Sequence, residues 1–335
     1  YIREEGEYLM SNRGPMSVAS PHDYMFFSVI NNDFGRRDRF YYFGFGRSYP
    51  DGVESRRPAL GVEDKNGTYV GRYYESGGSG EVDGRQHIFE PGSTSIAFQH
   101  ISTGKGTNPN RFVRFEFNSF GETVTSGTNG LGTSSYLNGV GTMGAASDWG
   151  RNIIGLMSEV IAYERELTPD EKEAIYSYLG LKYAITLDYD NNDPSINFDY
   201  FISDKTKVWL GTTNTNTAIY HNNVAALVRD DDADLHNMQA RSTASGAVIH
   251  MGIGRKLGCP SDLDGFSVNK AAIVWGHNNT PLDRETDFAG NPDICGEMDK
   301  QLDRIWMVDK TGIDKQAVIL SPDRAAFPYN GAGYQ

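Results

Sequence analysis

Several sequence features are scarce in this chain of 335 residues, and each scarcity excludes a class of protein. No stretch approaches the roughly 18 apolar residues that a membrane-spanning helix needs, so we expect no membrane span. Lys and Arg form no run and the net charge is −13, which argues against a nucleic-acid partner. The 2 cysteines, Cys259 and Cys295, lack the CxxC spacing of a metal site, so they form either one disulfide or two buried thiols.

Motifs that carry catalysis are also missing. The sequence has neither a GxSxG elbow nor an HExxH zinc motif, and its 7 histidines are scattered. The nearest pair of carboxylates for a glycoside hydrolase, Glu81 and Asp83, lies in "GEVDG", whose glycines favour a turn. His221, between Tyr220 and Asn222, fits a hydrogen-bonded structural residue better than a metal ligand. We therefore expect a protein that is not an enzyme.

What the chain does contain is typical of β structure. The 38 Gly residues, 19 Tyr and 17 Phe indicate aromatic-rich strands joined by many turns. Because the strand-like runs follow one another with almost no helical period between them, they favour a sandwich or jelly roll over βαβ units. The predicted strands are residues 25–31, 39–46, 58–64, 94–101, 111–117 and 153–163, followed by 206–210, 222–230, 247–254, 271–279, 303–312 and 316–321.

One helix interrupts this pattern, in "SEVIAYERELTPDEKEAIYSYLGLKYAITL" (158–187). Thr168 fits the N-cap, Pro169 the first helical position, and Glu171 completes a capping box. The residues at helical spacing should place one face against the sandwich, and Gly180 should be a weak point. These face residues are Ala174, Ile175, Tyr178, Leu179 and Lys182.

This segment resembles the closing segment of laminin-G-like, concanavalin-type jelly rolls in large secreted and cell-surface proteins of Bacteroidetes-type bacteria. Those domains end in a strand similar to "GLMSEVIAYEREL", then a helix similar to "TPDEKEAIYSYLGLKYAITL". The resemblance implies a laminin-G-like jelly roll over residues 1–187, with its N-terminus expected to be truncated. Ala184 stands where the pattern usually has Gly, which could alter the capping of the helix.

A composition change after Leu187 marks the expected start of a second domain. "DYDNNDPSINFDYF" is polar, acidic and contains proline, as a connector should be. The following "YHNNVAALVRDDD" and the later "RIWMV" resemble the β-rich module that accompanies this jelly roll in the same bacterial proteins. We therefore predict a second, sandwich-like β domain over residues 188–335, expected to continue beyond the fragment.

Two acidic clusters and a few aromatic residues are the candidate binding residues. Asp188, Asp190, Asn192 and Asp193, and separately Asp230 and Asp231, offer the oxygen ligands that Ca²⁺ prefers. The alternative is that they form solvated acidic turns, with Arg229 pairing internally with Asp230 and Asp231. For a sugar, the candidate platforms are Tyr73, Tyr74 and Trp149, although strand alternation places about half of such residues in the core.

Together these observations predict a non-catalytic adhesion or display module of an exported, extracellular bacterial protein. Its expected partners are a surface glycan, a protein or a second copy of itself, and Ca²⁺ is the one candidate cofactor. Two alternatives stay open at this stage. The chain could be a carbohydrate-binding module of a polysaccharide-degrading enzyme, or a structural subunit of a surface filament.

Overall fold

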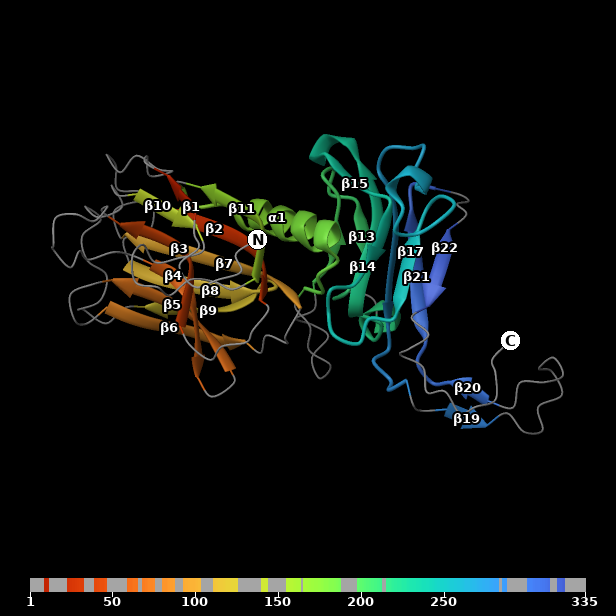
Figure 1. Ribbon diagram of the computed structural model, residues 1–335, viewed down its shortest axis with the longest axis horizontal. Helices are drawn as coiled ribbons and strands as arrows, with labels where there is room; N and C mark the ends of the chain where they lie inside the picture. Colours follow the sequence, from red (N-terminus) through yellow and green to blue (C-terminus); the bar gives the residue numbers. More distant parts are fainter. Residues whose placement is uncertain are drawn as a thin grey trace. The chain divides into compact units, whose positions relative to one another are not determined.

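The structure is a computed structural model of the chain (Figure 1). The chain separates into two compact units, Tyr1–Lys172 (unit 1) and Glu173–Gln335 (unit 2). This division falls within the long helix and so lies earlier than the predicted limits of 1–187 and 188–335. The structure describes residues 9–11, 23–32, 39–46, 59–65, 68–75, 80–87, 93–103, 111–125, 140–143, 155–163, 165–187, 198–212, 215–282, 285–287, 300–313 and 318–322.

Unit 1 consists of two antiparallel β-sheets that form a sandwich (Figure 1). One sheet has the order β1-β10-β3-β4-β5-β6 and the other the order β11-β2-β7-β8-β9. β6 contacts β8 and β9, so the two sheets meet face to face, and the predicted β-sandwich is confirmed. The strands are β1 (Leu9–Ser11), β2 (Tyr24–Asn32), β3 (Arg39–Gly46), β4 (Ala59–Lys65), β5 (Thr68–Glu75), β6 (Gly80–His87), β7 (Thr94–Thr103), β8 (Arg111–Phe117), β9 (Phe120–Thr125), β10 (Val140–Met143) and β11 (Gly155–Tyr163).

The centre of the five-stranded sheet explains its apolar sequence. Residues 25–30 of β2 are all buried, so both faces of this strand are covered and a continuous apolar run is required. Phe27 lies opposite Phe98 of β7, and the two ring centroids are 4.7 Å apart. This tightly packed pair belongs to the core of unit 1.

One predicted turn of unit 1 is a strand. "GEVDG" belongs to β6, in which Glu81 pairs with Tyr74 and Asp83 pairs with Arg72 of β5. The expectation of a turn was wrong. Glycine lowers the local preference for a strand, but pairing with β5 stabilises the extended conformation of this segment.

The long helix α1 (Pro169–Tyr183) begins at the predicted capping box. The Glu171 amide donates to Thr168 Oγ1 at 3.2 Å, and the Thr168 amide donates to Glu171 Oε2 at 2.9 Å. Glu171 also pairs with Arg165 at 2.7 Å. These bonds satisfy backbone donors that every helix start leaves open, so the sequence signal and the structure agree.

The buried face of α1 differs from the predicted one. The buried residues are Tyr176, Ser177, Leu179, Gly180 and Leu181, whereas Ala174 is exposed. They pack within unit 2: Ser177 Oγ accepts a hydrogen bond from the Phe201 amide at 3.2 Å. A Cβ atom on Gly180 would lie 2.9 Å from side-chain carbons of Leu187 and Tyr200. Gly180 is therefore a point of close approach and not merely a weakness of the helix.

Unit 2 is also built from antiparallel sheets, the largest having the order β15-β14-β18-β21 and the next β16-β17-β22. Only Met238 separates β15 from β16, so this stretch of chain passes from one sheet to the other, as at the corner of a sandwich. The strands are β12 (Tyr200–Phe201), β13 (Lys207–Trp209), β14 (Asn222–Asp230), β15 (Leu235–Asn237), β16 (Gln239–Arg241), β17 (Ile249–Gly252), β18 (Ala271–His277), β19 (Glu285–Asp287), β20 (Lys300–Leu302), β21 (Trp306–Thr311) and β22 (Ile319–Pro322). Short helices are α2 (Thr215–Ala218), η2 (Asp231–Ala233) and η3 (Pro260–Asp262).

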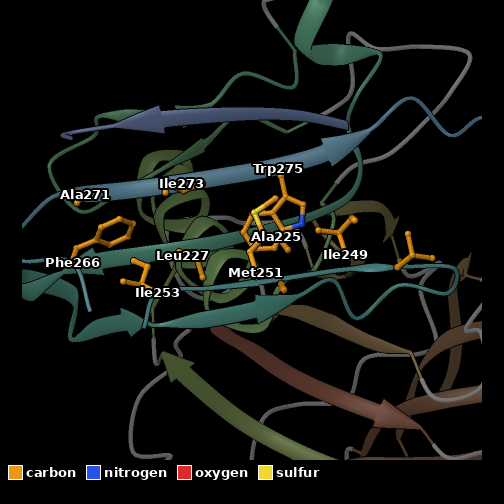
Figure 2. Packing of buried hydrophobic residues seen from close by; sticks show 11 residues of the cluster. Ala225, Leu227, Ile249, Met251, Ile253, Phe266, Ala271, Ile273 and Trp275 are labelled. Carbon is orange, nitrogen blue, oxygen red and sulfur yellow. The ribbon is translucent and has the colours of Figure 1, made fainter. Parts of the chain in front are cut away.

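An apolar cluster fills the space between these two sheets (Figure 2). Trp275 and Ile273 of β18 and Leu227 of β14 meet Met251 and Ile249 of β17 in this cluster. Trp306 of β21 packs against this cluster and is partly buried. The predicted second β-rich, sandwich-like domain is thus confirmed. Among the described residues, no helix has the length and apolar character that crossing a membrane requires.

Candidate functional site

The acidic residues at the end of β14 and just after it pair with basic side chains of unit 2. Asp230 is fully buried and accepts hydrogen bonds from the Ser203 amide at 2.7 Å, the Ser203 hydroxyl at 2.8 Å and Lys270 Nζ. Burial by itself would raise the pKa of Asp230, but the hydrogen bonds from Lys270 and Ser203 outweigh it and hold the pKa below its usual value. Asp230 therefore fastens the loop before β13 to the turn before β18.

Asp231 has a different set of partners. Its carboxylate pairs with Arg229 Nε at 2.9 Å and lies 3.0 Å from His236 Nε2. The Arg229 hydrogen bond is the main cause that lowers the pKa of Asp231. Arg229 also donates to the Phe266 carbonyl at 2.8 Å, which ties β14 to the loop before β18. The predicted internal pairing of Arg229 is confirmed for Asp231, whereas Asp230 pairs with Lys270.

These contacts do not support the calcium hypothesis for Asp230 and Asp231. Each carboxylate is already neutralised by a cationic side chain, and the two bind different groups instead of converging on one point. Within the ranges that the structure describes, no group of three or more His, Cys, Asp or Glu side chains could hold a metal ion. The other predicted calcium ligands, Asp188, Asp190, Asn192 and Asp193, lie outside those ranges.

The remaining predicted site residues are only partly covered by the structure. Tyr73 and Tyr74 lie in β5, where Tyr73 pairs with Leu60 and Tyr74 with Ala59 of β4. Trp149 lies outside the described residues. Cys259 is a free, half-buried thiol, and Cys295 also lies outside the described residues, so the disulfide stays a prediction.

His221 is a structural residue, as predicted. It is fully buried, its Nδ1 accepts a hydrogen bond from Trp209 Nε1 at 3.1 Å, and its Nε2 donates to the Leu187 carbonyl at 2.6 Å. Burial lowers the pKa of His221 to about 4, so the ring is neutral at physiological pH. The histidine thus links β13, the end of the α1 segment and the start of β14.

Unit 1 contains a buried carboxylate that the sequence interpretation missed. Glu116 of β8 has no exposed surface and pairs with Arg114 on the same strand and with Lys172 Nζ at 2.8 Å. Lys172 also lies 5.3 Å from the centre of the Phe98 ring. The alternation of charge and aromatic residues in "RFVRFEF" was visible, but a partner 56 residues away in sequence was not. This group anchors the first turn of α1 to the sheet of unit 1.

Unit 2 also has exposed apolar side chains. Most of them lie on or beside two edge strands, β21 and β22. Among the described strands, β21 pairs only with β18, and β22 only with β17. The exposed fractions are 45% for Ile305, 52% for Val308, 39% for Val318 and 54% for Leu320. We call β21, β22 and these four residues the open edge of unit 2.

Strand register shows that two of these side chains occupy core-facing positions. Directly opposed residues in an antiparallel pair share one face of the sheet. Val308 is opposite Trp275, and Leu320 is opposite Met251; Trp275 and Met251 belong to the buried cluster. Val308 and Leu320 therefore continue the apolar inner faces of the two sheets, yet solvent reaches them. Such an edge can bind another strand or an apolar surface.

Comparisons with known proteins give one match to a family model, and it covers the second unit. Residues 171–334 match the model of a domain of unknown function (DUF8202), which begins at the helix α1, as unit 2 does. No curated protein matches the chain.

Solved structures give low similarity. Domains LG4-5 of the mouse laminin alpha1 chain are 10% identical with a TM-score of 0.35; the match covers 50% of this chain and 41% of that one. The CBM40 of a Ruminococcus gnavus sialidase is 12% identical with a TM-score of 0.35, and the match covers 45% and 81%. A Trypanosoma rangeli sialidase is 14% identical with a TM-score of 0.34, and the match covers 47% and 23%. The chain therefore spans less than half of the laminin fragment.

Proposed function

We propose that this chain is a non-catalytic adhesion and display module of an exported bacterial protein, and that its open edge binds another macromolecule. The observation that carries the proposal is the exposure of Val308 and Leu320 at positions that face the core of unit 2. Exposed apolar side chains at such positions lower the stability of the fold unless a partner covers them. Edge strands of β-sheets also promote association with other chains. The edge is therefore best understood as a surface for binding.

The polar groups described above support a scaffold role over catalysis. Asp230, Asp231, Glu116 and His221 each hold two or more segments of chain together through hydrogen bonds or ion pairs. Perturbed pKa values often mark catalytic groups, but ion-pair and burial effects of structural origin explain those of Asp230, Asp231 and His221. These residues position loops and strands for display.

The test is binding to arrays of purified glycans and purified extracellular proteins, with and without EDTA. We expect binding by the wild-type chain that is weakened by Val308→Lys and by Leu320→Lys. Val268→Lys is the matched control, because Val268 is 49% exposed but lies in the loop before β18. Binding that all three variants retain would reject the open edge as the binding surface, and no binding to either array would reject the proposed function.

The glycan array also separates the two partner classes. Binding to glycans that is unchanged in the Val308 and Leu320 variants would favour a carbohydrate-binding module that uses another surface. Binding lost on addition of EDTA would point to a calcium site outside the described residues. Protein binding that depends on Val308 would favour adhesion through the open edge.

A further inference from the structure

The histidine that ends β18 has a buried donor without an acceptor. His277 is 2% exposed, and its Nδ1 accepts a hydrogen bond from the Asn279 amide at 2.9 Å. Burial lowers the pKa of His277 to about 4, so the ring is neutral at physiological pH and its one proton lies on Nε2. Within the described part of the chain, this Nε2 has no hydrogen-bond partner. Because an unpaired buried donor costs free energy, the N–H is suited to an acceptor that the chain itself does not supply.

A half-buried cation in the same region lacks a counter-ion. Arg304 donates through Nε to the Thr280 carbonyl at 2.5 Å and through Nη1 to the Gly246 carbonyl at 3.4 Å. Both acceptors are neutral. Burial lowers the pKa of Arg304, whereas a neighbouring carboxylate would raise it. Among the described residues, therefore, no carboxylate neutralises this charge.

Strand pairing places the two groups at the same end of unit 2. His277 is opposite Trp306 in the pair of β18 and β21, with ring centroids 6.1 Å apart, and Arg304 comes two residues before Trp306. The Gly246 carbonyl belongs to the turn before β17, which lies in the other sheet. Arg304 therefore bridges the two sheets beside the end of β18. Its charge also contributes to the lowered pKa of His277, as expected for neighbouring groups.

The unsatisfied groups at this end are all donors. A guanidinium has five N–H groups in a planar fork, and Arg304 uses two of them; the His277 Nε2–H adds another. A carboxylate offers a negative charge and two acceptor oxygens, and it pairs with arginine in a bidentate geometry. Trp306, which is partly buried, adds an aromatic ring that suits the C–H groups of a sugar. An acidic sugar presents both features in one residue.

We propose that Arg304, His277 and Trp306 form a binding site for the carboxylate of an acidic sugar, such as a uronic acid. The carboxylate pairs with the Arg304 fork and accepts a hydrogen bond from His277, while the sugar ring lies against Trp306. Because His277 Nε2 has no exposed surface, the Trp306 side chain shifts as the ligand enters, so binding changes the Trp306 fluorescence. The inference goes beyond the proposed function, which rests on Val308 and Leu320.

Titration of the full chain with D-glucuronate tests the site, with D-glucose as the neutral counterpart. Calorimetry at physiological ionic strength measures both affinities, and we expect glucuronate to bind about tenfold more tightly or better. Arg304→Gln should remove this preference, and Arg304→Lys, which keeps the charge without the fork, should retain only part of it. Arg255→Gln is the matched control, because Arg255 is an exposed arginine in another loop of unit 2.

Two spectroscopic signals locate the ligand. Glucuronate, but not glucose, should change the tryptophan fluorescence, and Trp306→Phe should lose this change. In protein labelled with ¹⁵N-histidine, the His277 Nε2–H resonance should shift on addition of glucuronate. These signals do not depend on a variant at His277, whose replacement in the core could impair folding.

Equal affinities for glucuronate and glucose, or no binding of either, would overturn the proposal. Glucuronate binding that Arg304→Gln retains in full would do the same. A short polyglutamate peptide is the second probe: if it binds through Arg304 while glucuronate does not, the site takes an acidic protein chain and the sugar assignment fails.

The open-edge variant Leu320→Lys separates this inference from the proposed function. It should weaken binding to the arrays but leave glucuronate binding unchanged, because Leu320 lies in β22 and not at the end of β18. Loss of array binding in Arg304→Gln with no effect of Leu320→Lys would support the sugar site and reject the open edge.

Discussion

The buried carboxylate of Asp230 depends on a single charged partner, Lys270. We expect Lys270→Met to destabilise unit 2 by about 3 kcal/mol, because the carboxylate would stay buried without its cation. Asp230→Asn combined with Lys270→Met should recover part of this loss, since no unpaired charge remains. The measurement is urea unfolding followed by the fluorescence of the buried Trp209 and Trp275.

A matched control for this prediction is Lys256→Met, which removes an exposed lysine from another loop of unit 2. It should change the free energy of unfolding by no more than about 0.5 kcal/mol. Equal effects of Lys256→Met and Lys270→Met would contradict the role of the buried pair.

Three buried histidines predict a loss of stability in acid. Burial lowers the pKa of His100, His221 and His277 to about 4, with Lys172 and Arg114 adding to the effect at His100 and Arg304 at His277. The unfolded chain, in which histidine titrates near 6.5, therefore binds more protons between these two values. The contribution of each neutral, buried histidine to the free energy of unfolding is fully present above pH about 6.5. It is lost as the pH drops towards 4, by about 3 kcal/mol for each fully buried histidine.

The variant His221→Gln isolates one of these contributions. It should be less stable than the wild type at neutral pH, because Trp209 and the Leu187 carbonyl lose a partner matched to both. Its free energy of unfolding should nevertheless decline less steeply between pH about 6.5 and about 4. The urea midpoint measured across this range decides the matter, and an unchanged slope would show that His221 does not titrate on unfolding.

At the scale of single elements, β14 and β18 approach so closely that a glycine is required. A Cβ atom on Gly276 would lie 2.2 Å from the Tyr220 carbonyl oxygen and 3.1 Å from that of Asn222, beside the register shift between Asn222 and Ala225. We expect Gly276→Ala to destabilise unit 2 by about 3 kcal/mol, because the two carbonyl oxygens belong to the backbone and cannot move aside.

Gly265→Ala provides the control for that substitution. Its new methyl group would find only Met238 Cγ, at 3.9 Å, so we expect a change below about 1 kcal/mol. Thermal unfolding followed by circular dichroism compares the two variants. A Gly276→Ala protein as stable as Gly265→Ala would mean that the strands can separate there at little cost.

The elements that could be predicted share a strong local signal. The apolar run of β2 and the capping box of α1 depend on residues adjacent in sequence, and both were located correctly. The buried face of α1 was not, because Tyr176 is buried beside Phe198, a contact 22 residues away in sequence that the helix period does not reveal. At Ala184, where the pattern usually has Gly, the backbone adopts the left-handed conformation with φ 52°, so the cap forms with Ala.

At the scale of the whole molecule, the division within α1 predicts which fragment folds. We expect residues 165–335 to unfold cooperatively on their own, because this fragment keeps Leu179 and Leu181, which are buried within unit 2. Residues 188–335, the domain predicted from composition, should give a broad or absent transition, since they lack this buried face and the Leu187 carbonyl that His221 binds. Calorimetry of both fragments, with the full chain as reference, distinguishes them. Equal transitions in both would place the boundary after Leu187.

The candidate site was less predictable than the fold. The sequence correctly suggested charge pairing at Arg229, because aspartates follow it directly in the chain. It also suggested a structural role for His221, which has polar residues on both sides in the sequence. It gave no indication of the open edge, because a strand at the end of a sheet has the same alternating pattern as one inside it. The pairing of β21 with β18 shows that Val308 lies on the core-facing side of the sheet, and its burial shows that it is nevertheless exposed to solvent.

The sequence by itself determined the β class, most strand positions and the start of the helix, because these follow from alternation and from capping residues a few positions apart. The tertiary structure decided the rest. It assigned most of α1 to unit 2, gave Asp230 and Glu116 their cations, and left Val308 and Leu320 exposed. Each of these depends on segments distant in sequence coming together, and burial and partner choice are properties of that assembly and not of any local pattern.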